Sequence, residues 1–159
     1  QRPQPPATGD GAPKQATLKT ICHRLLIGAP AETVYEALST QKGLAGWWTP
    51  DTSAKPEVGS TASFAFGPGL LTEMKIEELR PYSKVKWLCL KAREEWIGTT
   101  LHFELEPHAK GTILFFHHDG WKACTPEFAS CSYVWALFFR SLKFFCETGK
   151  GFPYPEFDK

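Results

Sequence analysis

The chain has few of the features that mark membrane, secreted or nucleic-acid-binding proteins. No apolar run approaches the roughly 20 residues that a membrane-spanning helix requires, so no transmembrane segment is predicted. The five cysteines form no Cys-x-x-Cys pair and their number is odd, which does not suit a disulfide framework; a reducing, cytoplasmic location is therefore expected. With 18 basic against 17 acidic residues and no basic stripe, nucleic acid is not an expected partner.

Methionine is nearly absent as well. The only one is Met74, and the sequence begins with Gln1 rather than an initiator. Cleavage of a signal peptide and trimming of the chain both account for this start, so export stays an alternative to the cytoplasm.

The motifs of common catalytic and metal sites are missing too. There is no Gly-x-Ser-x-Gly elbow, no His-x-x-x-His pair and no cluster of carboxylates. His117 and His118 are adjacent, but neighbouring side chains on a strand point to opposite faces, so they cannot hold one ion together. His102 shares the outer face with Glu104 and is expected to be exposed to solvent. No metal site, cofactor or catalytic residue is predicted, and whether the protein is an enzyme stays open.

Aromatic residues are what the chain has in abundance, with 12 Phe, 6 Trp and 4 Tyr among 159 residues. Many fall in short alternating segments, which are typical of strands with one buried face. Tight turns between these segments indicate an antiparallel meander. The predicted strands cover residues 17–27, 62–66, 70–79, 85–89, 101–105 and 113–118.

Helical patterns occur at two places. The first helix is predicted from Pro30 to about Thr40, after which Gly43 breaks the pattern and a short helical turn ends at Trp47-Trp48. The second is long. It starts after the N-cap Thr125, repeats apolar residues at three- and four-residue steps, and ends at Gly149.

Composition also divides the chain. Residues 1–16 are rich in proline and poor in apolar side chains, so a flexible leader is expected there. Residues 17–153 are expected to form one domain, and residues 154–159 a short tail.

Five local strings carry a resemblance to a known family. They are HRL to APAETVY at 23–35, GLAGWW at 43–48, EWIGT at 95–99, GT to HDGW at 111–121 and SLK to ETGKG at 141–151. In this order they resemble the heat-shock-protein ATPase activator homologue family of the START-related SRPBCC superfamily, over residues 17–153.

The resemblance implies an α+β helix-grip fold, in which a curved antiparallel sheet wraps around the long C-terminal helix and leaves a cavity between them. Such folds host carriers, cyclases and co-chaperones, so the fold alone does not set the function. The eukaryotic activator anchors its chaperone through a separate large N-terminal domain. The present sequence has only a short leader there, and a chaperone partner is therefore not expected.

The inward positions of the predicted strands and helix define a candidate ligand pocket. Either a pocket wall or a filled core is compatible with any one of these side chains. Consecutive tryptophans cannot both point inward from one helical turn, so one of Trp47 and Trp48 is expected to close the core and the other to cap the opening; the alternative is that both only close the core. The candidates are Trp47, Trp48, Phe66, Met74, Trp87, Trp96, Phe103, Phe116, His118, Phe128 and Trp135.

His118 is the polar member of this set. A buried imidazole must be hydrogen-bonded, and burial lowers its pKa. Three roles are compatible with its position: a bonded structural group, a group that orients a ligand, or a general acid or base. Tyr133 and Glu95 are further candidates for orienting a ligand.

The function predicted from these patterns is binding of an apolar or amphipathic small molecule, such as a lipid, isoprenoid or polyketide-like compound. One alternative is a cyclase or aromatase that uses His118 as acid or base, and another is a module that activates a chaperone ATPase. Surplus apolar residues on the long helix, such as Leu137 and Phe144, are compatible with a homodimer contact.

Overall fold

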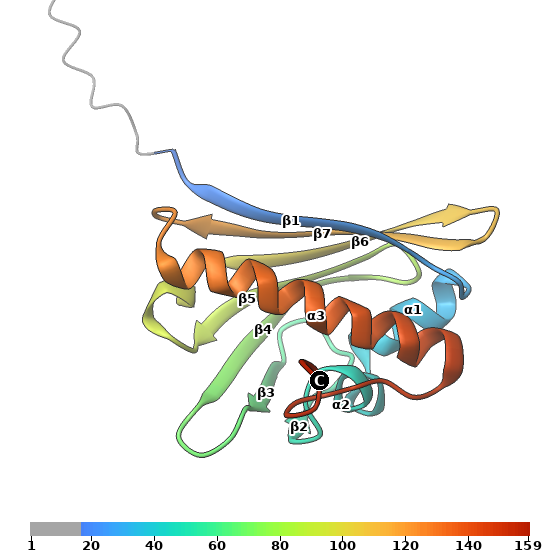
Figure 1. Cartoon of the computed structure of the whole chain (residues 1–159), viewed down its shortest axis with the longest axis horizontal. Coiled ribbons are helices and arrows are strands. Elements are labelled where there is room, and N and C mark those ends of the chain that lie inside the picture. Colours follow the sequence, from blue (N-terminus) through green and yellow to red (C-terminus); the bar gives the residue numbers. More distant parts are fainter. Residues whose placement is uncertain (1–16) are drawn as a thin grey trace, which may run out of the picture.

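A single sheet of seven antiparallel strands curves around one long helix (Figure 1). The computed structural model describes residues 17–159, and the leader predicted over residues 1–16 lies outside this range. The strands are β1 (Lys19–Ile27), β2 (Thr52–Ser53), β3 (Thr61–Ala65), β4 (Leu71–Arg80), β5 (Lys84–Lys91), β6 (Thr100–His108) and β7 (Gly111–Trp121). The helices are α1 (Ala31–Ser39), α2 (Gln41–Trp47), the short 3-10 turn η1 (Glu94–Trp96) and α3 (Pro126–Thr148). This is the helix-grip arrangement that the sequence predicts.

The sheet has the order β1-β7-β6-β5-β4-β3-β2, so strands β2 to β7 form the predicted meander. The first strand breaks the simple order because it pairs with the last, placing Leu25 opposite Leu114. Helices α1 and α2 lie between β1 and β2 in the chain and cover one end of the curve (Figure 1).

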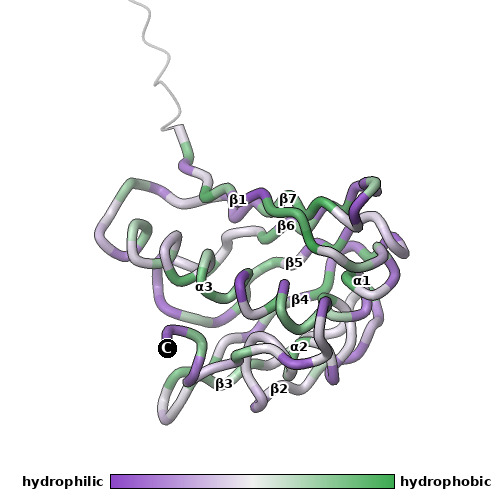
Figure 2. Tube along the Cα trace, turned by 45° about the vertical axis from the view of Figure 1, so that its right-hand side comes forward, coloured by the Kyte–Doolittle hydropathy of each residue, from purple (hydrophilic) through white to green (hydrophobic). Residues whose placement is uncertain are grey.

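Alternation along the strands explains how the sheet buries one face. Val85, Trp87 and Cys89 of β5 are all buried, as predicted, and their neighbours along the strand are not. Leu101 and Phe103 of β6 lie directly opposite Trp87 and Val85 and continue the same apolar layer. Figure 2 shows the result as hydrophobic positions that recur along the strands and α3 between hydrophilic ones.

Thr40 separates the two short helices. It is extended, ends α1, and its hydroxyl accepts a hydrogen bond from the backbone N–H of Gly43 at 3.0 Å, which caps α2. Gly43 was expected to break the helical pattern, but it lies inside α2. A Cβ atom there would come within 2.5 Å of the Ala37 backbone, so glycine is required for the close approach of the two helices.

Helix α3 begins and ends where the sequence predicts. The Thr125 hydroxyl accepts from the backbone N–H of Phe128 at 3.1 Å, Pro126 occupies the first turn, and Gly149 ends the helix in the left-handed conformation. Its buried stripe, which includes Trp135 and Leu142, packs into the concave face of the sheet. Among residues 17–159, no helix combines the length and apolarity that crossing a bilayer demands.

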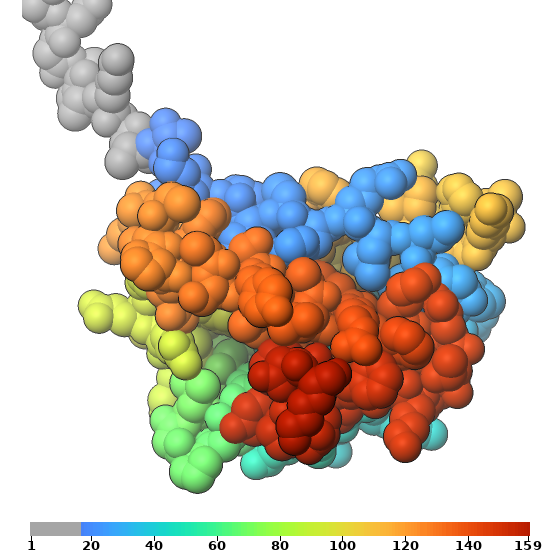
Figure 3. Space-filling model, viewed as in Figure 1, coloured from blue at the N-terminus to red at the C-terminus, as the bar shows by residue number. Residues whose placement is uncertain are grey.

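The segment that follows α3 folds back onto the domain. In Figure 3 it lies against α3 and beside the hairpin of β3 and β4. The buried Ser141 hydroxyl donates to the backbone carbonyl of Trp47 at 2.8 Å and accepts from the backbone N–H of Phe152 at 2.7 Å, which joins α2, α3 and this segment. The predicted tail, residues 154–159, therefore includes side chains that pack against the core, among them Tyr154 and Phe157.

Candidate functional site: an aromatic cavity

A cavity of about 390 Å³ opens between the first half of α3, the turn joining β3 to β4, the segment around η1 and the C-terminal segment. Seven of its fifteen lining residues are aromatic: six come from these four regions, and Trp48 follows α2. The cavity therefore presents flat apolar walls rather than a narrow aliphatic channel. The aromatic residues are Trp48, Phe66, Trp96, Trp135, Phe138, Tyr154 and Phe157.

Four of the eleven predicted site residues line this cavity: Trp48, Phe66, Trp96 and Trp135. Four others, Met74, Trp87, Phe103 and Phe116, point inward from the sheet as predicted but are fully covered by neighbouring side chains. The middle of the curved sheet is thus a filled core, and the cavity lies towards one end of it.

Trp48 is the reason why the cavity lies towards one end of the curved sheet and not at its middle. Its ring stacks on Trp87 at 5.7 Å and lies 4.5 Å from Phe64, so it occupies the space that would otherwise form a central pocket. Its other contacts include Trp135 at 5.4 Å. Trp48 consequently forms the floor of the cavity instead of a cap over its mouth.

The remaining predicted residues lie away from the cavity. Trp47 is fully buried, and its indole N–H donates to the backbone carbonyl of Ala37 at 2.7 Å, so both tryptophans of the pair close the core. Phe128 packs edge-on against Trp121 at 5.3 Å. His118 lies behind the cavity wall rather than on its surface.

Both nitrogens of His118 are engaged in hydrogen bonds. Its Nδ1 accepts from the indole N–H of Trp135 at 3.3 Å, so the proton of the neutral ring is on Nε2. That Nε2–H donates to Oγ1 of Thr99 at 2.8 Å, and the Thr99 hydroxyl donates in turn to the backbone carbonyl of Trp96. The chain of bonds ends on two residues of the cavity wall.

This network holds His118 as a neutral ring. Burial lowers the pKa of His118 to about 3, with a smaller opposing effect from Asp119, so the ring is neutral at physiological pH. In this structure both ring nitrogens contact protein groups, and His118 holds Trp135 directly and the Trp96 segment through Thr99.

Polar groups occur mainly at the rim of the cavity. Nη1 of Arg93 lies 3.2 Å from a carboxylate oxygen of Glu127 at the start of α3, and most of the Arg93 side chain is exposed. Thr72 is the buried polar residue of the lining. The two orienting groups suggested by the sequence lie elsewhere, since Tyr133 is 68% exposed and Glu95 is exposed in η1.

Sequence reasoning missed Arg93, Tyr154 and Phe157. The two aromatic residues follow the helix-ending glycine at spacings that match neither a strand nor a helix, so periodicity gave no signal. Their presence in a short tail was itself a usable signal, because a free tail has little reason to carry large apolar side chains. Arg93 lies in an irregular connection, and nothing in its local sequence marks it.

Metal ligands are not gathered in the cavity. Cys131 and Glu127 line it, but within residues 17–159 the one cluster of His, Cys, Asp and Glu close enough to share an ion lies on the other face of the sheet. The lining of the cavity is mostly apolar, with charged groups at its rim.

Comparisons with known proteins agree with the fold. A comparison with curated protein sequences finds no match. Among solved structures, the chain is similar to the Aha1 dimer from Colwellia psychrerythraea, with 40% identity, a TM-score of 0.77, and coverage of 84% of this chain and 99% of that one. It is also similar in fold to CalU16 from Micromonospora echinospora, with 18% identity, a TM-score of 0.67, and coverage of 89% and 80%.

A further fold relative is DynU16, a protein in the dynemicin biosynthetic locus, with 23% identity and a TM-score of 0.68 over 83% of this chain and 48% of that one. The match to a protein family says to which group of proteins the chain belongs. Residues 28–147 match the family described as Activator of Hsp90 ATPase homolog 1-like protein, a range that runs from the residue after β1 to the last turn of α3. The chain therefore belongs to the Activator of Hsp90 ATPase homolog 1-like family, as the strings in its sequence predict.

Proposed function

We propose that this protein binds a planar, largely apolar small molecule with one anionic group in the cavity beside α3. The observation that carries the proposal is a cavity of about 390 Å³ that is lined by seven aromatic side chains and has a single arginine at its rim. Ligand cavities of proteins typically enclose about 300–1,000 Å³ and are lined by apolar side chains with few polar groups.

The apolar part of the ligand would bind to the aromatic walls. Trp96 and Trp135 stack on one another at 5.8 Å with an interplanar angle of 24°, and Trp135 is fixed from behind by His118. Rings held in this way offer flat surfaces that lose little freedom on binding, so a rigid aromatic or polycyclic ligand would be favoured over a flexible chain.

The anionic group would bind to Arg93. Its present partner Glu127 makes an exposed ion pair, and such pairs contribute only about 0–1 kcal/mol. Exchange of the Glu127 carboxylate for a carboxylate or sulfonate of the ligand therefore costs little. The guanidinium also offers two parallel N–H donors for such a group.

A direct test uses 8-anilinonaphthalene-1-sulfonate, whose fused rings and sulfonate match the two halves of the proposed site. Val134→Phe places an extra ring in the cavity and is expected to weaken binding of this probe at least about tenfold, which is about 1.4 kcal/mol. The matched control Val58→Phe makes the same change at an exposed position outside the cavity and should bind as the wild type does.

The polar half of the site is tested separately. Arg93→Gln should weaken probe binding about three- to tenfold, whereas Arg80→Gln, an exposed arginine on β4, should not. Circular dichroism and thermal unfolding establish that each variant is native, since this probe also binds partly unfolded chains. Unchanged binding by a folded Val134→Phe variant would contradict the proposal.

A second candidate function is activation of a chaperone ATPase. The observation in its favour is the 40% identity to a protein described as Aha1, together with the family description. It predicts that the chain raises the ATPase rate of Hsp90 in a purified assay, and an unchanged rate at saturating concentration would exclude it.

We also infer that the chain forms homodimers, because that relative is described as a dimer. Sedimentation velocity over a range of protein concentrations measures the association. A monomer at every concentration would contradict the inference.

A further inference from the structure

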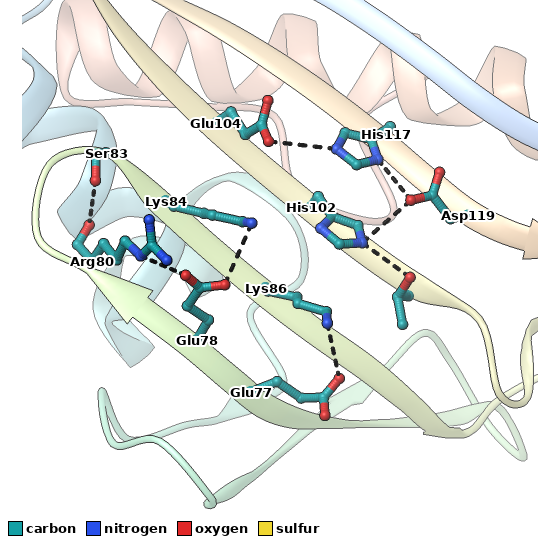
Figure 4. A network of polar contacts seen from close by, with 11 residues as sticks. Glu77, Glu78, Arg80, Ser83, Lys84, Lys86, His102, Glu104, His117 and Asp119 are labelled. Carbon is teal, nitrogen blue, oxygen red and sulfur yellow. Dashed lines mark hydrogen bonds and ion pairs between the residues drawn. The ribbon is translucent and has the colours of Figure 1, made fainter.

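Three ligand-type side chains meet on the face of the sheet that points away from α3. His102 of β6 lies directly across the strand pair from His117 of β7, and Asp119 follows two residues later on the same face. Figure 4 shows the two imidazoles side by side with the Asp119 carboxylate between their near edges. Their ligand atoms all lie within 4.8 Å of one another.

The contacts within this group are specific. Oδ2 of Asp119 is 2.8 Å from Nδ1 of His117 and 3.3 Å from Nε2 of His102. The two rings are stacked at 4.2 Å with an interplanar angle of 7°. One carboxylate oxygen therefore already lies close to a nitrogen of each ring. Nε2 of His102 also lies 3.0 Å from the Thr100 hydroxyl, a contact that an ion would replace.

We propose that Nε2 of His102, Nδ1 of His117 and a carboxylate oxygen of Asp119 bind one divalent transition-metal ion, with Zn²⁺ as the preferred ion. Two imidazole nitrogens and a carboxylate oxygen are a common zinc ligand set. The lone pair of each imidazole nitrogen lies in the plane of its ring, so the two stacked rings must turn out of their parallel arrangement to reach one ion at about 2.0–2.2 Å. The half-buried, solvent-facing position leaves room for water at the remaining coordination position.

The surroundings of the three ligands support the assignment. Oε1 of Glu104 is 3.7 Å from Nε2 of His117, the nitrogen that carries the proton when Nδ1 binds a metal. The Thr20 hydroxyl donates to the other Asp119 oxygen at 2.9 Å. Carboxylates and hydroxyls at such positions orient metal ligands and strengthen binding.

The charges around the group are also compatible with a cation. The nearest cationic side chains come from β5, where Lys84 is paired with Glu78 at 3.4 Å and Lys86 with Glu77 at 3.8 Å (Figure 4). Burial, followed by the neighbouring His117, lowers the pKa of His102; Asp119 opposes this shift, and Lys84 and Lys86 add smaller contributions in the same direction as burial.

The sequence-based expectation of no metal site overlooked this group. Excluding His117 together with His118 was sound, because those side chains point to opposite faces. His102, however, was expected to be exposed, whereas only 13% of its side chain is accessible because it stacks on His117. The register that places β6 and β7 side by side cannot be read from single-strand patterns.

This site lies on the opposite face from the cavity and does not depend on the proposed function. Its bound ion would join β6 to β7 through side chains, so we expect the metal to raise the unfolding temperature as a ligand of the native state does. The site is tested by isothermal titration of tag-free protein with Zn²⁺. One ion per chain is expected for the wild type.

Variants locate the ion. His117→Gln, His102→Gln and Asp119→Asn are each expected to weaken Zn²⁺ binding at least about tenfold and to abolish the zinc-dependent rise in unfolding temperature, and Glu104→Gln to weaken it about tenfold. The matched control His108→Gln removes a histidine from the exposed last position of β6 and should bind as the wild type does. Cys22→Ser should also bind normally, although Cys22 lies opposite His117 on β1.

Nitrogen chemical shifts provide an independent readout. Zinc should change the imidazole ¹⁵N signals of Nε2 in His102 and Nδ1 in His117 in the wild type, and leave His108 and His23 unchanged. Loss of binding in Cys22→Ser would overturn the assignment of the three ligands. Retained binding in folded His117→Gln, or shifts confined to His108, would overturn the site itself.

Discussion

The indole N–H of Trp135 donates to Nδ1 of His118 across 3.3 Å, and this bond joins the long helix to the last strand in the buried core. Because Nδ1 is an acceptor, the ring must carry its proton on Nε2, where it donates to Thr99. The imidazole is therefore held as one neutral tautomer. Protonation would break the Trp135 bond and place a charge in an aromatic environment.

The pH dependence of stability should report this arrangement. The pKa of His118 is about 3 in the native state and about 6.5 in the unfolded chain, so between these values the unfolded state binds a proton that the native state does not. The free energy of unfolding should thus fall as the pH drops below about 6, by about 1.4 kcal/mol per pH unit from this group.

His118→Gln removes that contribution while keeping a donor and an acceptor near Thr99 and Trp135. Urea unfolding is measured in the presence of EDTA between pH 7 and pH 4.5. The free energy of unfolding should depend less steeply on pH for His118→Gln than for the wild type, and the difference in slope should correspond to about one proton bound on unfolding. His108→Gln should keep the wild-type dependence. Equal slopes for His118→Gln and the wild type would show that His118 is not held neutral.

Ser141 should be a stability determinant although it does not line the cavity. Ser141→Ala leaves the backbone carbonyl of Trp47 and the backbone N–H of Phe152 without their shared partner. Loss of a buried hydrogen bond of this kind costs about 1–3 kcal/mol. Chemical denaturation measures the effect, and Ser130→Ala, an exposed serine of the same helix, should stay within about 0.5 kcal/mol of the wild type.

Phe157 should contribute to the cavity wall. It stacks on Phe138 at 4.1 Å with an interplanar angle of 19°, so Phe157→Ala should destabilise the native state by about 0.5–1.5 kcal/mol and also weaken binding of the naphthalene sulfonate probe. Phe152→Ala is the matched control, because Phe152 packs on Phe144 outside the cavity and should leave probe affinity unchanged. Normal probe affinity in Phe157→Ala would remove this segment from the site.

The cysteines should divide into two classes of reactivity. Cys22 and Cys124 are exposed, whereas burial raises the pKa of Cys89 and of Cys146 to about 12, and raises that of Cys131 further. A thiol reagent at pH 8 should therefore modify two thiols per native chain rapidly and the other three only after unfolding. Rapid modification of a third thiol, mapped by peptide mass spectrometry, would contradict this division.

Most of the fold could be predicted because its signals are local. The alternation of Val85, Trp87 and Cys89 identified a strand and its inner face, and Thr125 with Gly149 set the ends of α3. The resemblance of short strings then supplied the way these elements combine.

The candidate site was less accessible to prediction because it depends on how distant elements pack. The alternation pattern places Trp87 and Phe66 alike on the inner face of the sheet. Trp87 is nevertheless covered whereas Phe66 lines the cavity, and only the position of Trp48 between them accounts for this difference. The cluster of His102 and His117 has the same origin, since it exists only through the register of two strands.

The pairing of β1 with β7 also has a consequence for synthesis of the protein. Thr20 bonds Asp119 across a separation of 99 positions, and topologies dominated by such distant pairs fold on the slow, millisecond-to-second scale. At a translation rate of about 5–20 residues per second, β1 must wait on the order of ten seconds for its partner strand β7 to emerge from the ribosome. Until β7 is synthesised, the unpaired edge of β1 on the nascent chain is free to pair with other strands. The fold is therefore most exposed to misassembly during this interval.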